Sequence, residues 1–291
     1  MPATFPLSTT PVAGEPYCRY PYMHVDVPTS RDRLRYFSIH KYQKMLDPAA
    51  YTIQPCYFIR KDDFRQLLNI FVNQEGLENS DRLRILFTLY DDGPDVPANC
   101  KNSFTFIFAT TYPDGHGNYV NKKFFIIDSA EEPGNGVKEI TLEDAVKWTK
   151  NYKTQIRPKL DGTIYRDPLH PEDSPYDTNS IDYEILGICQ VYREIDYQLQ
   201  KNPNVTLSGI EIYFSSFRTP DKDPRNTEYP SCYPQRVITE IRIIETVLGK
   251  HFEFDITDMD DFLFRHKSER PISGFDTGNI CPPRCGGSIN P

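Results

Sequence analysis

The sequence predicts an α+β fold in which helices are layered on a mainly antiparallel sheet. Apolar residues alternate with period two in several short segments and recur at helical spacing in others. These segments also follow one another in a similar order in the two halves of the chain. We therefore expect an internal repeat, with two related helix-helix-hairpin units that share one interior.

The predicted domain organisation has three parts. Residues 1–33 form a Pro-rich N-terminal arm, and residues 34–137 form the first α+β unit. Residues 138–291 form the second unit, which carries long Pro-rich insertions and a Cys-containing tail. The prolines between Pro2 and Pro28 favour extended chain and oppose a helix in the arm. One helix-helix-hairpin unit is too small to bury much apolar surface, so the two units are expected to pack together.

The first unit is expected to begin with helices and continue with strands. Apolar residues recur at helical spacing over residues 34–46 and again over residues 61–73. The period then changes to two, which predicts strands over residues 82–90, 102–112 and 122–128. Aspartate, glycine and proline between these segments mark the turns.

The second unit repeats this order with longer connections. A helix is expected over residues 140–152, with Thr141 as its N-terminal cap. Residues 154–180 are polar and rich in proline and predict a long loop. Isoleucines at alternating spacings of four and three predict a second helix over residues 181–199. Period-two alternation predicts the strands over 208–216, 236–247 and 251–256.

Composition and charge exclude several classes of protein. The 33 Lys and Arg against 41 Asp and Glu give a net charge of −8, which argues against general nucleic-acid binding. No apolar run is long enough to span a membrane, and the N-terminus lacks the pattern of a signal peptide. The 7 Cys are scattered, as expected of mostly reduced thiols. We therefore expect a cytoplasmic protein, with non-classical secretion left open.

The most specific motif is Cys281-Pro282-Pro283-Arg284-Cys285 in the tail. Cys281 and Cys285 fit three interpretations: a metal clip, a disulfide that staples the tail, or plain buried thiols. Three residues intervene between the two cysteines, so redox catalysis of the C-x-x-C type does not fit. The other cysteines are isolated, and we therefore expect no metal and no cofactor.

The second half of the chain resembles a group of short bacterial proteins. The resemblance is carried by ITLEDAVKWTKNY, by the strand GIEIYFSS and by the ending CPPRCGG. Proteins of that group open with a similar helix and end in C-P-P-x-C, whereas the long Pro-rich insertions depart from their pattern. The resemblance implies a shared fold unit and brings no activity, substrate or cofactor with it.

Histidines near carboxylates are the candidate catalytic or metal-ligating residues. His24 lies near Asp26, and His170 lies near Glu172 and Asp173. A metal-dependent hydrolase would need such ligands to converge in space. The sequence contains no H-E-x-x-H and no close pair of histidines, so solvated loops are the simpler interpretation of these residues.

Other catalytic signatures are absent from the sequence. The glycine-containing run at 133–136 has neither the spacing of a P-loop nor that of a dinucleotide-binding turn. No G-x-S-x-G nucleophile elbow occurs. A triad assembled from distant positions is still compatible with the sequence.

These observations favour a non-enzymatic structural or interaction protein over an enzyme. We expect it to self-associate, as a homo-oligomer or fibre, through its N-terminal arm and strand edges. Two alternatives stay open: a metal-dependent hydrolase that uses loop His and Asp/Glu, and a peptide- or glycan-binding module with a Tyr-rich surface. The expected partner is a second copy of the chain, and neither nucleic acid nor a membrane is expected.

Overall fold

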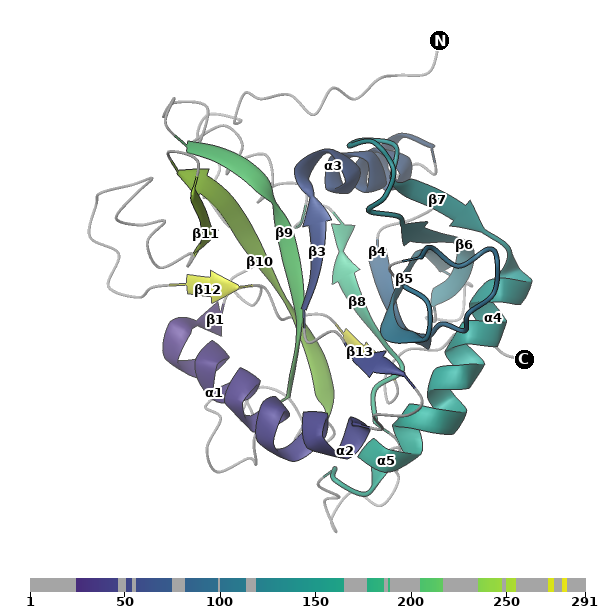
Figure 1. Cartoon of the computed structure of the whole chain (residues 1–291), viewed down its shortest axis with the longest axis vertical. Helices are drawn as coiled ribbons and strands as arrows, with labels where there is room; N and C mark the ends of the chain where they lie inside the picture. Colours follow the sequence, from purple (N-terminus) through teal and green to yellow (C-terminus); the bar gives the residue numbers. More distant parts are fainter. Residues whose placement is uncertain are drawn as a thin grey trace.

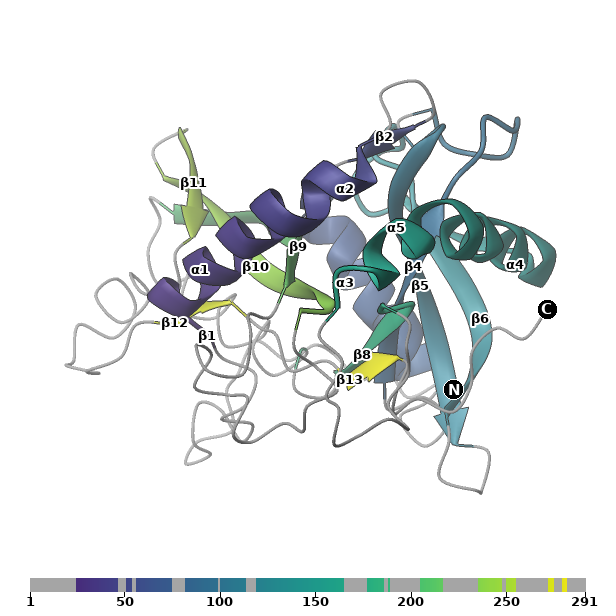
Figure 2. The same ribbon diagram turned by 90° about the horizontal axis from the view of Figure 1, so that it is seen from below.

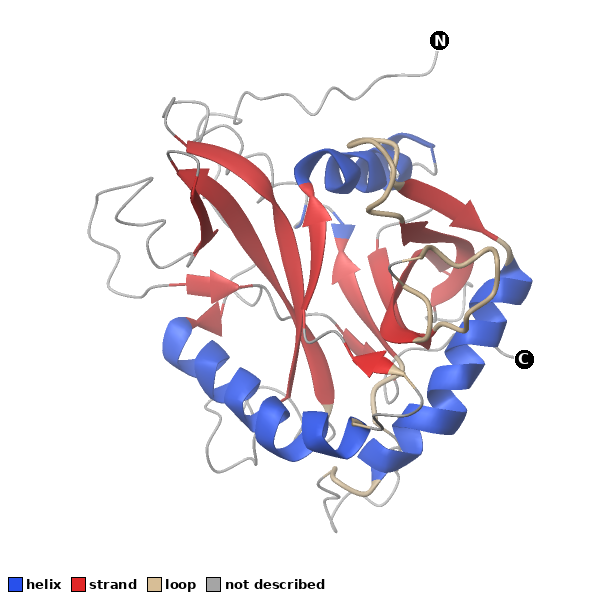
Figure 3. Ribbon diagram, viewed as in Figure 1, coloured by secondary structure: helices blue, strands red, loops and turns tan. Residues whose placement is uncertain are grey.

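Two sheets face a shared core in this computed structural model, and helices cover them (Figure 1). The strands are mainly antiparallel, which confirms the predicted α+β class (Figure 3). The structure describes residues 25–46, 51–53, 56–74, 82–98, 100–113, 119–164, 177–185, 188, 205–216, 235–247, 250–254, 272–274 and 279–281.

The helices share an unusual feature, a π-helical turn near the C-terminal end of each long helix. In two cases a short α-helix continues after the π-helical turn. The α-helices are α1 (Val27–Phe37), α2 (Gln43–Met45), α3 (Lys61–Asn69), α4 (Leu142–Asn151) and α5 (Arg157–Asp161). The π-helical turns are Ser38–Tyr42, Ile70–Gln74 and Tyr152–Ile156.

The strands form a larger sheet, a smaller sheet and a separate pair. The larger sheet has the order β13-β8-β4-β5-β6-β7, with β2 beside β5, and the smaller has the order β11-β10-β9-β3. Strand β1 pairs with β12. The first strands are β1 (Val25–Asp26), β2 (Thr52–Ile53), β3 (Cys56–Arg60), β4 (Arg82–Leu89), β5 (Ser103–Pro113), β6 (Tyr119–Ile127) and β7 (Val137–Ile140). The remaining strands are β8 (Ser180–Glu184), β9 (Val205–Ser216), β10 (Val237–Val247), β11 (Lys250–Phe254), β12 (Ile272–Gly274) and β13 (Asn279–Cys281).

Each sheet contains strands from both halves of the chain. In the larger sheet β8 joins β4, and in the smaller sheet β3 joins β9. Helix α1 packs on β9 and helix α4 packs on β4, as the view from below shows (Figure 2). The run from β4 to β8 thus builds most of the larger sheet, whereas the smaller sheet combines segments from both ends of the described chain.

Aromatic rings from both sheets form the centre of the core. The ring of Phe214 on β9 lies 4.5 Å from Phe104, 4.6 Å from Phe106 and 5.4 Å from Phe87, centroid to centroid. The ring of Tyr152 stacks on Phe104 at 5.4 Å. All five side chains are buried. Close aromatic pairs of this kind add to the stability that area burial alone provides.

Two helix boundaries differ from the expected ones, and each difference involves a proline. Helix α1 begins at Val27 and contains Pro28, although proline was expected to oppose a helix here. The expected loop after residue 154 is also wrong at its start, because the helix continues to Asp161 with Pro158 in the first turn of α5. Pro28 is in the first turn of α1, where a proline removes no helical hydrogen bond, and Pro158 comes directly after the π-helical turn, near the start of α5.

The expected helix over residues 181–199 is wrong at its beginning. Residues Ser180–Glu184 form strand β8, and Ile185 and Ile188 are helical. The rest of that expected helix lies outside the described residues. Ile181, Tyr183 and Ile185 alternate with polar residues, so the segment satisfies period two as well as helical spacing.

Two other expectations have clear outcomes. The side chain of Thr141 caps α4, because its Oγ1 accepts a hydrogen bond from the backbone N–H of Asp144 at 3.1 Å. This confirms the predicted cap. Within the described part of the chain, every helix is too short or too polar to cross a bilayer.

Candidate functional site

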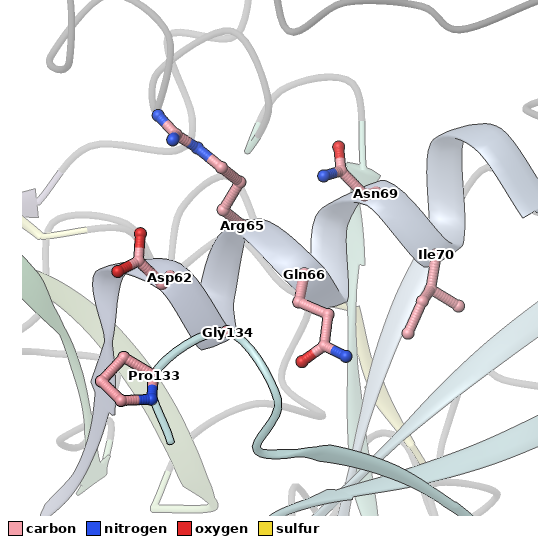
Figure 4. A pocket seen from close by; sticks show the side chains of 7 residues that line it. All are labelled: Asp62, Arg65, Gln66, Asn69, Ile70, Pro133 and Gly134. Atoms are coloured by element: carbon pink, nitrogen blue, oxygen red, sulfur yellow. The ribbon is translucent and has the colours of Figure 1, made fainter. Parts of the chain in front are cut away.

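A cavity of about 430 Å³ lies between helix α3 and the loop that precedes β7 (Figure 4). We call this cavity, together with strand β7, the α3–β7 site. Its lining is mostly polar and combines a carboxylate, a guanidinium and two amides with two apolar side chains. The lining residues are Asp62, Arg65, Gln66, Asn69, Ile70, Pro133 and Gly134.

The amphipathic pattern of α3 positions the helical side of the site. Phe64, Leu67 and Leu68 are buried in the core, which turns the opposite face of the helix outward. Asp62 and Asp63 lie in the first turn, where carboxylates interact favourably with the helix dipole. The polar face of α3 is therefore fixed by the burial of its apolar face.

Asp63 fixes the loop side of the site. This carboxylate is fully buried, and its Oδ1 accepts hydrogen bonds from the backbone N–H groups of Gly134 at 2.9 Å and Gly136 at 3.0 Å. Its Oδ2 accepts from Arg60 Nε at 2.5 Å, and Arg60 Nη1 donates to the carbonyl of Glu131 at 2.7 Å. The glycine run at 133–136 thus binds a carboxylate of the protein itself, which accounts for it without a bound phosphate.

The two glycines of this loop are needed for geometric reasons. Gly134 has a φ of 86°, which is the left-handed region that residues with a side chain rarely adopt. A Cβ on Gly136 would lie 2.8 Å from the carbonyl oxygen of Asp128 and 2.8 Å from Oδ1 of Asp63. Substitution at either position would therefore displace the loop from α3.

Strand β7 presents an open backbone edge beside the cavity. Gly136 accepts a hydrogen bond from Asp128 N–H, and β7 then pairs with β6 in antiparallel register. Because bonding alternates along an antiparallel pair, the backbone groups of Val137 and Glu139 face away from β6. Gln66 Oε1 accepts the N–H of Val137 at 3.1 Å. The carbonyl of Val137 and both backbone groups of Glu139 then face an edge on which the described residues place no further strand.

Carboxylates and one lysine set the charge at the start of β7. Lys138 Nζ lies 2.6 Å from Glu131 Oε1 and 3.0 Å from Asp128 Oδ2, and these hydrogen bonds raise the pKa of Lys138. Burial would raise the pKa of Asp128, but the hydrogen bonds from Lys138 and from the N–H of Ala130 outweigh burial and lower it. Both groups are therefore charged at neutral pH.

The nearby thiol of Cys100 is unsuited to nucleophilic chemistry. Cys100 is buried, and burial raises its pKa to about 11, although the hydrogen bond with Tyr57 opposes this shift. A thiol rather than a thiolate is a poor nucleophile at neutral pH. Cys100 therefore acts as a small core residue.

The structure brings few of the predicted site residues together. Cys281 ends β13, where its backbone pairs with Ser180, but its side chain and all of Cys285 lie outside the described residues, so the tail staple remains a prediction. Asp26 lies in β1, whereas His24 also falls outside the described residues.

The loop histidines give the hydrolase hypothesis no described site. His170, Glu172 and Asp173 lie outside the described residues. His40 is exposed on the helical segment after α1, where its ring lies 4.3 Å from that of Tyr36. Across the described ranges, no group of three His, Cys, Asp or Glu side chains could hold a metal ion.

Comparisons with protein-family models, with curated proteins and with solved structures give no match. The α3–β7 site is therefore interpreted from its own geometry. Its helical residues were not predicted from the sequence, although Asp62, Gln66 and Asn69 have the four-and-three spacing of one helix face. That spacing could have indicated a polar face, but not that a distant glycine loop lies against it.

Proposed function

We propose that the protein is a non-enzymatic interaction protein that self-associates by strand addition at β7. The observation that carries this proposal is the open edge of β7, which ends the larger sheet on that side within the described residues. An extended segment that pairs with such an edge gains main-chain hydrogen bonds, while adjacent pockets accept its side chains. The α3–β7 site combines both features.

The proposed occupant is the N-terminal arm of a second copy of the chain. Residues 1–24 precede β1 and contain five prolines, a composition that favours extended chain. Their only charged side chains are Glu15 and Arg19, so the arm is nearly neutral. A nearly neutral arm can approach a chain with a net charge of −8 without the electrostatic repulsion that acts between the folded parts of two such chains.

The edge also carries charged side chains that limit direct pairing of the β7 strands of two chains. Lys138 and Glu139 are exposed on β7, and charged side chains are a common way to protect an edge strand. If two β7 strands paired directly in an antiparallel register centred on Lys138 or on Glu139, that residue would lie opposite its own copy, and like charges opposite each other destabilise a sheet. This disfavours direct β7–β7 pairing and favours the neutral arm as the added strand.

The test is sedimentation velocity over a range of concentrations, with two variants and one control. Glu139→Pro removes an N–H that faces the open edge, a position where edge strands tolerate proline. Deletion of residues 1–24 removes the proposed occupant and stops before β1. We expect each change to weaken self-association about tenfold or more, since main-chain hydrogen bonds of roughly 1.4 kcal/mol or more in sum are lost.

Glu139→Gln is the matched control, because it removes the charge and keeps the N–H. We expect this variant to associate like the unmodified protein. A full-length protein that stays monomeric at high concentration would exclude the proposal. Unchanged association of both Glu139→Pro and the deletion variant would also exclude it.

A further inference from the structure

Several elements of the two halves follow one another in the same order. Helix α1 and helix α4 each run into a π-helical turn and then a short α-helix. Strand β3 leads directly into helix α3, and strand β8 leads directly into the helical residue Ile185. Each half then continues with antiparallel strands, β4-β5-β6 in the first and β9-β10-β11 in the second.

The registers of the two sheets correspond as well. On β4, Arg84 lies opposite Asp182 of β8, and on β9, Glu211 lies opposite Phe58 of β3. Three residues beyond Arg84 is Phe87, and three residues beyond Glu211 is Phe214. These two phenylalanines contact each other in the core at 5.4 Å, as expected of equivalent residues near a local twofold axis.

The geometry points to a tandem of two α+β units that exchange their leading helix and strand. The first half places α1 and β3 on the sheet of the second half, and the second half places α4 and β8 on the sheet of the first. The interaction surface of each half is therefore the free side of its first long strand, β4 or β9. The partner that fits this surface is the leading helix and strand of the other half.

Charge makes the exchange specific for unlike halves. Arg84 of the first half forms two bonds to Asp182 of the second half, Nε–Oδ1 at 2.6 Å and Nη2–Oδ2 at 2.8 Å. Lys41 Nζ of the first half lies 2.8 Å from Asp177 Oδ2 of the second half. All four side chains are buried. The first half thus supplies the cations and the second half the carboxylates.

Pairing within one half would lose this complementarity. If β8 paired with β9 in the equivalent register, Asp182 would lie opposite Glu211, and like charges opposite each other destabilise a sheet. If β3 paired with β4, Arg84 would lie opposite Phe58 and would lose its carboxylate. Two unlike halves therefore bind each other in preference to a second copy of themselves.

The experiment uses the full chain with a protease site inserted between Ile140 and Thr141. The insertion leaves β7 intact and keeps Thr141 as the cap of α4. After cleavage of the folded protein, we expect the two fragments to remain together as a one-to-one complex. After separation in denaturant, we expect cooperative unfolding to return only when both fragments are refolded together.

Charge reversal tests which strands pair. Arg84→Glu in the first fragment should weaken association about 100-fold or more, because it breaks a buried ion pair. Asp182→Arg in the second fragment should restore at least about tenfold of that loss. The matched control is Asp182→Arg titrated against the unmodified first fragment, where it places Arg opposite Arg84. We expect this combination to associate more weakly than the unmodified fragments, because like charges opposite each other destabilise a sheet.

Three results would overturn the inference. The first is cooperative unfolding of either fragment alone as a monomer that does not bind the other fragment. The second is failure of Asp182→Arg to improve on Arg84→Glu alone, as measured by titration of one fragment with the other. The third is association of Asp182→Arg with the unmodified first fragment that is as tight as its association with Arg84→Glu. Self-association of whole chains is not required for any of these readouts, so they test the exchange separately from strand addition at β7.

Discussion

At the residue scale, the buried tyrosines act as hydrogen-bond donors to the main chain. Each of them donates its hydroxyl to a backbone carbonyl that would otherwise be buried next to apolar side chains. Burial is the main cause that raises the pKa of all these phenols. The donor–acceptor pairs are Tyr57–Ile127, Tyr90–Phe106, Tyr152–Thr178 and Tyr183–Thr239, at 2.7, 2.8, 2.6 and 2.8 Å.

Tyr152→Phe is expected to destabilise the protein by about 1–3 kcal/mol at neutral pH, because the Thr178 carbonyl loses its donor. The pKa of Tyr152 is raised in the folded state, so the unfolded chain ionises first, at a pH of about 10. The wild-type protein therefore loses stability as the pH rises above about 10, and the variant should lose less over that interval. Urea unfolding at neutral and alkaline pH measures both effects.

Tyr112→Phe is the control, because the side chain of Tyr112 is 40% exposed. Its stability should match that of the wild-type protein at both pH values. Equal stability of Tyr152→Phe and the wild-type protein at neutral pH would contradict the assigned role of the hydroxyl.

At the element scale, a single carboxylate joins helix α3 to the start of strand β7. Asp63 accepts the N–H groups of Gly134 and Gly136, while Gln66 accepts that of Val137. The helix thereby sets the position of the open edge. These three hydrogen bonds therefore hold the loop and the start of β7 against helix α3.

Asp63→Ala is expected to lower the free energy of unfolding by about 1.5–3 kcal/mol, the range for hydrogen bonds to a charged group. The loop over residues 129–136 should also become more sensitive to proteolysis, because its amides lose their acceptor. Asp63→Asn keeps an oxygen in the same position and should have a smaller effect on both. Limited proteolysis with mass spectrometry and urea unfolding provide the measurements. Equal stability and equal protease sensitivity of the alanine and asparagine variants would contradict the role of Asp63 as the acceptor of the Gly134 and Gly136 N–H groups.

Local pattern predicted most elements but not their partners. Strands β4 and β5 were expected because apolar residues recur with period two along them, and β6 was expected from the run KKFFIID. Thr141 was expected as a cap from its spacing to Asp144. Strand β8 was assigned to a helix because Ile181 and Ile185 satisfy both periods. Only its pairing with β4 resolves the ambiguity, and such pairing is not encoded in local spacing.

The α3–β7 site could not be predicted for the same physical reason. Asp63 and Gly136 are 73 residues apart in sequence, and nothing in the glycine run indicates which carboxylate it meets. The seven-residue lining was therefore found only once α3 and the loop were placed together. The residue types at 133–136 predicted a turn, but only the folded structure shows that Asp63 is its hydrogen-bond partner.

At the scale of the whole molecule, buried ion pairs connect elements that are distant in sequence. Asp177 accepts hydrogen bonds from Lys41 Nζ, in the π-helical turn after α1, and from the backbone N–H of Val237 on β10, both at 2.8 Å. This carboxylate thus links the helical segment after α1 to β10 of the smaller sheet. Removal of one member would leave the other buried without its partner.

Lys41→Met is expected to lower the free energy of unfolding by about 3–5 kcal/mol. Asp177→Asn keeps Oδ1 for the Val237 N–H and removes the charge. The free energy of unfolding of the double variant should exceed the value expected from adding the two single losses by about 0.5–3 kcal/mol. A double-mutant cycle from urea unfolding measures this coupling, and strict additivity would contradict the role of the pair.

The order in which the two sheets are completed has a consequence for synthesis. The central run from β4 to β8 leaves the ribosome as one stretch and can begin to fold early, since chains fold from the N-terminal side as they emerge. Helix α1 and strand β3 emerge before it, but their partner β9 is translated only after β8. The nascent chain must therefore expose the apolar side of α1 and β3 until β9 has been made, and that interval is when chaperones would have most to protect.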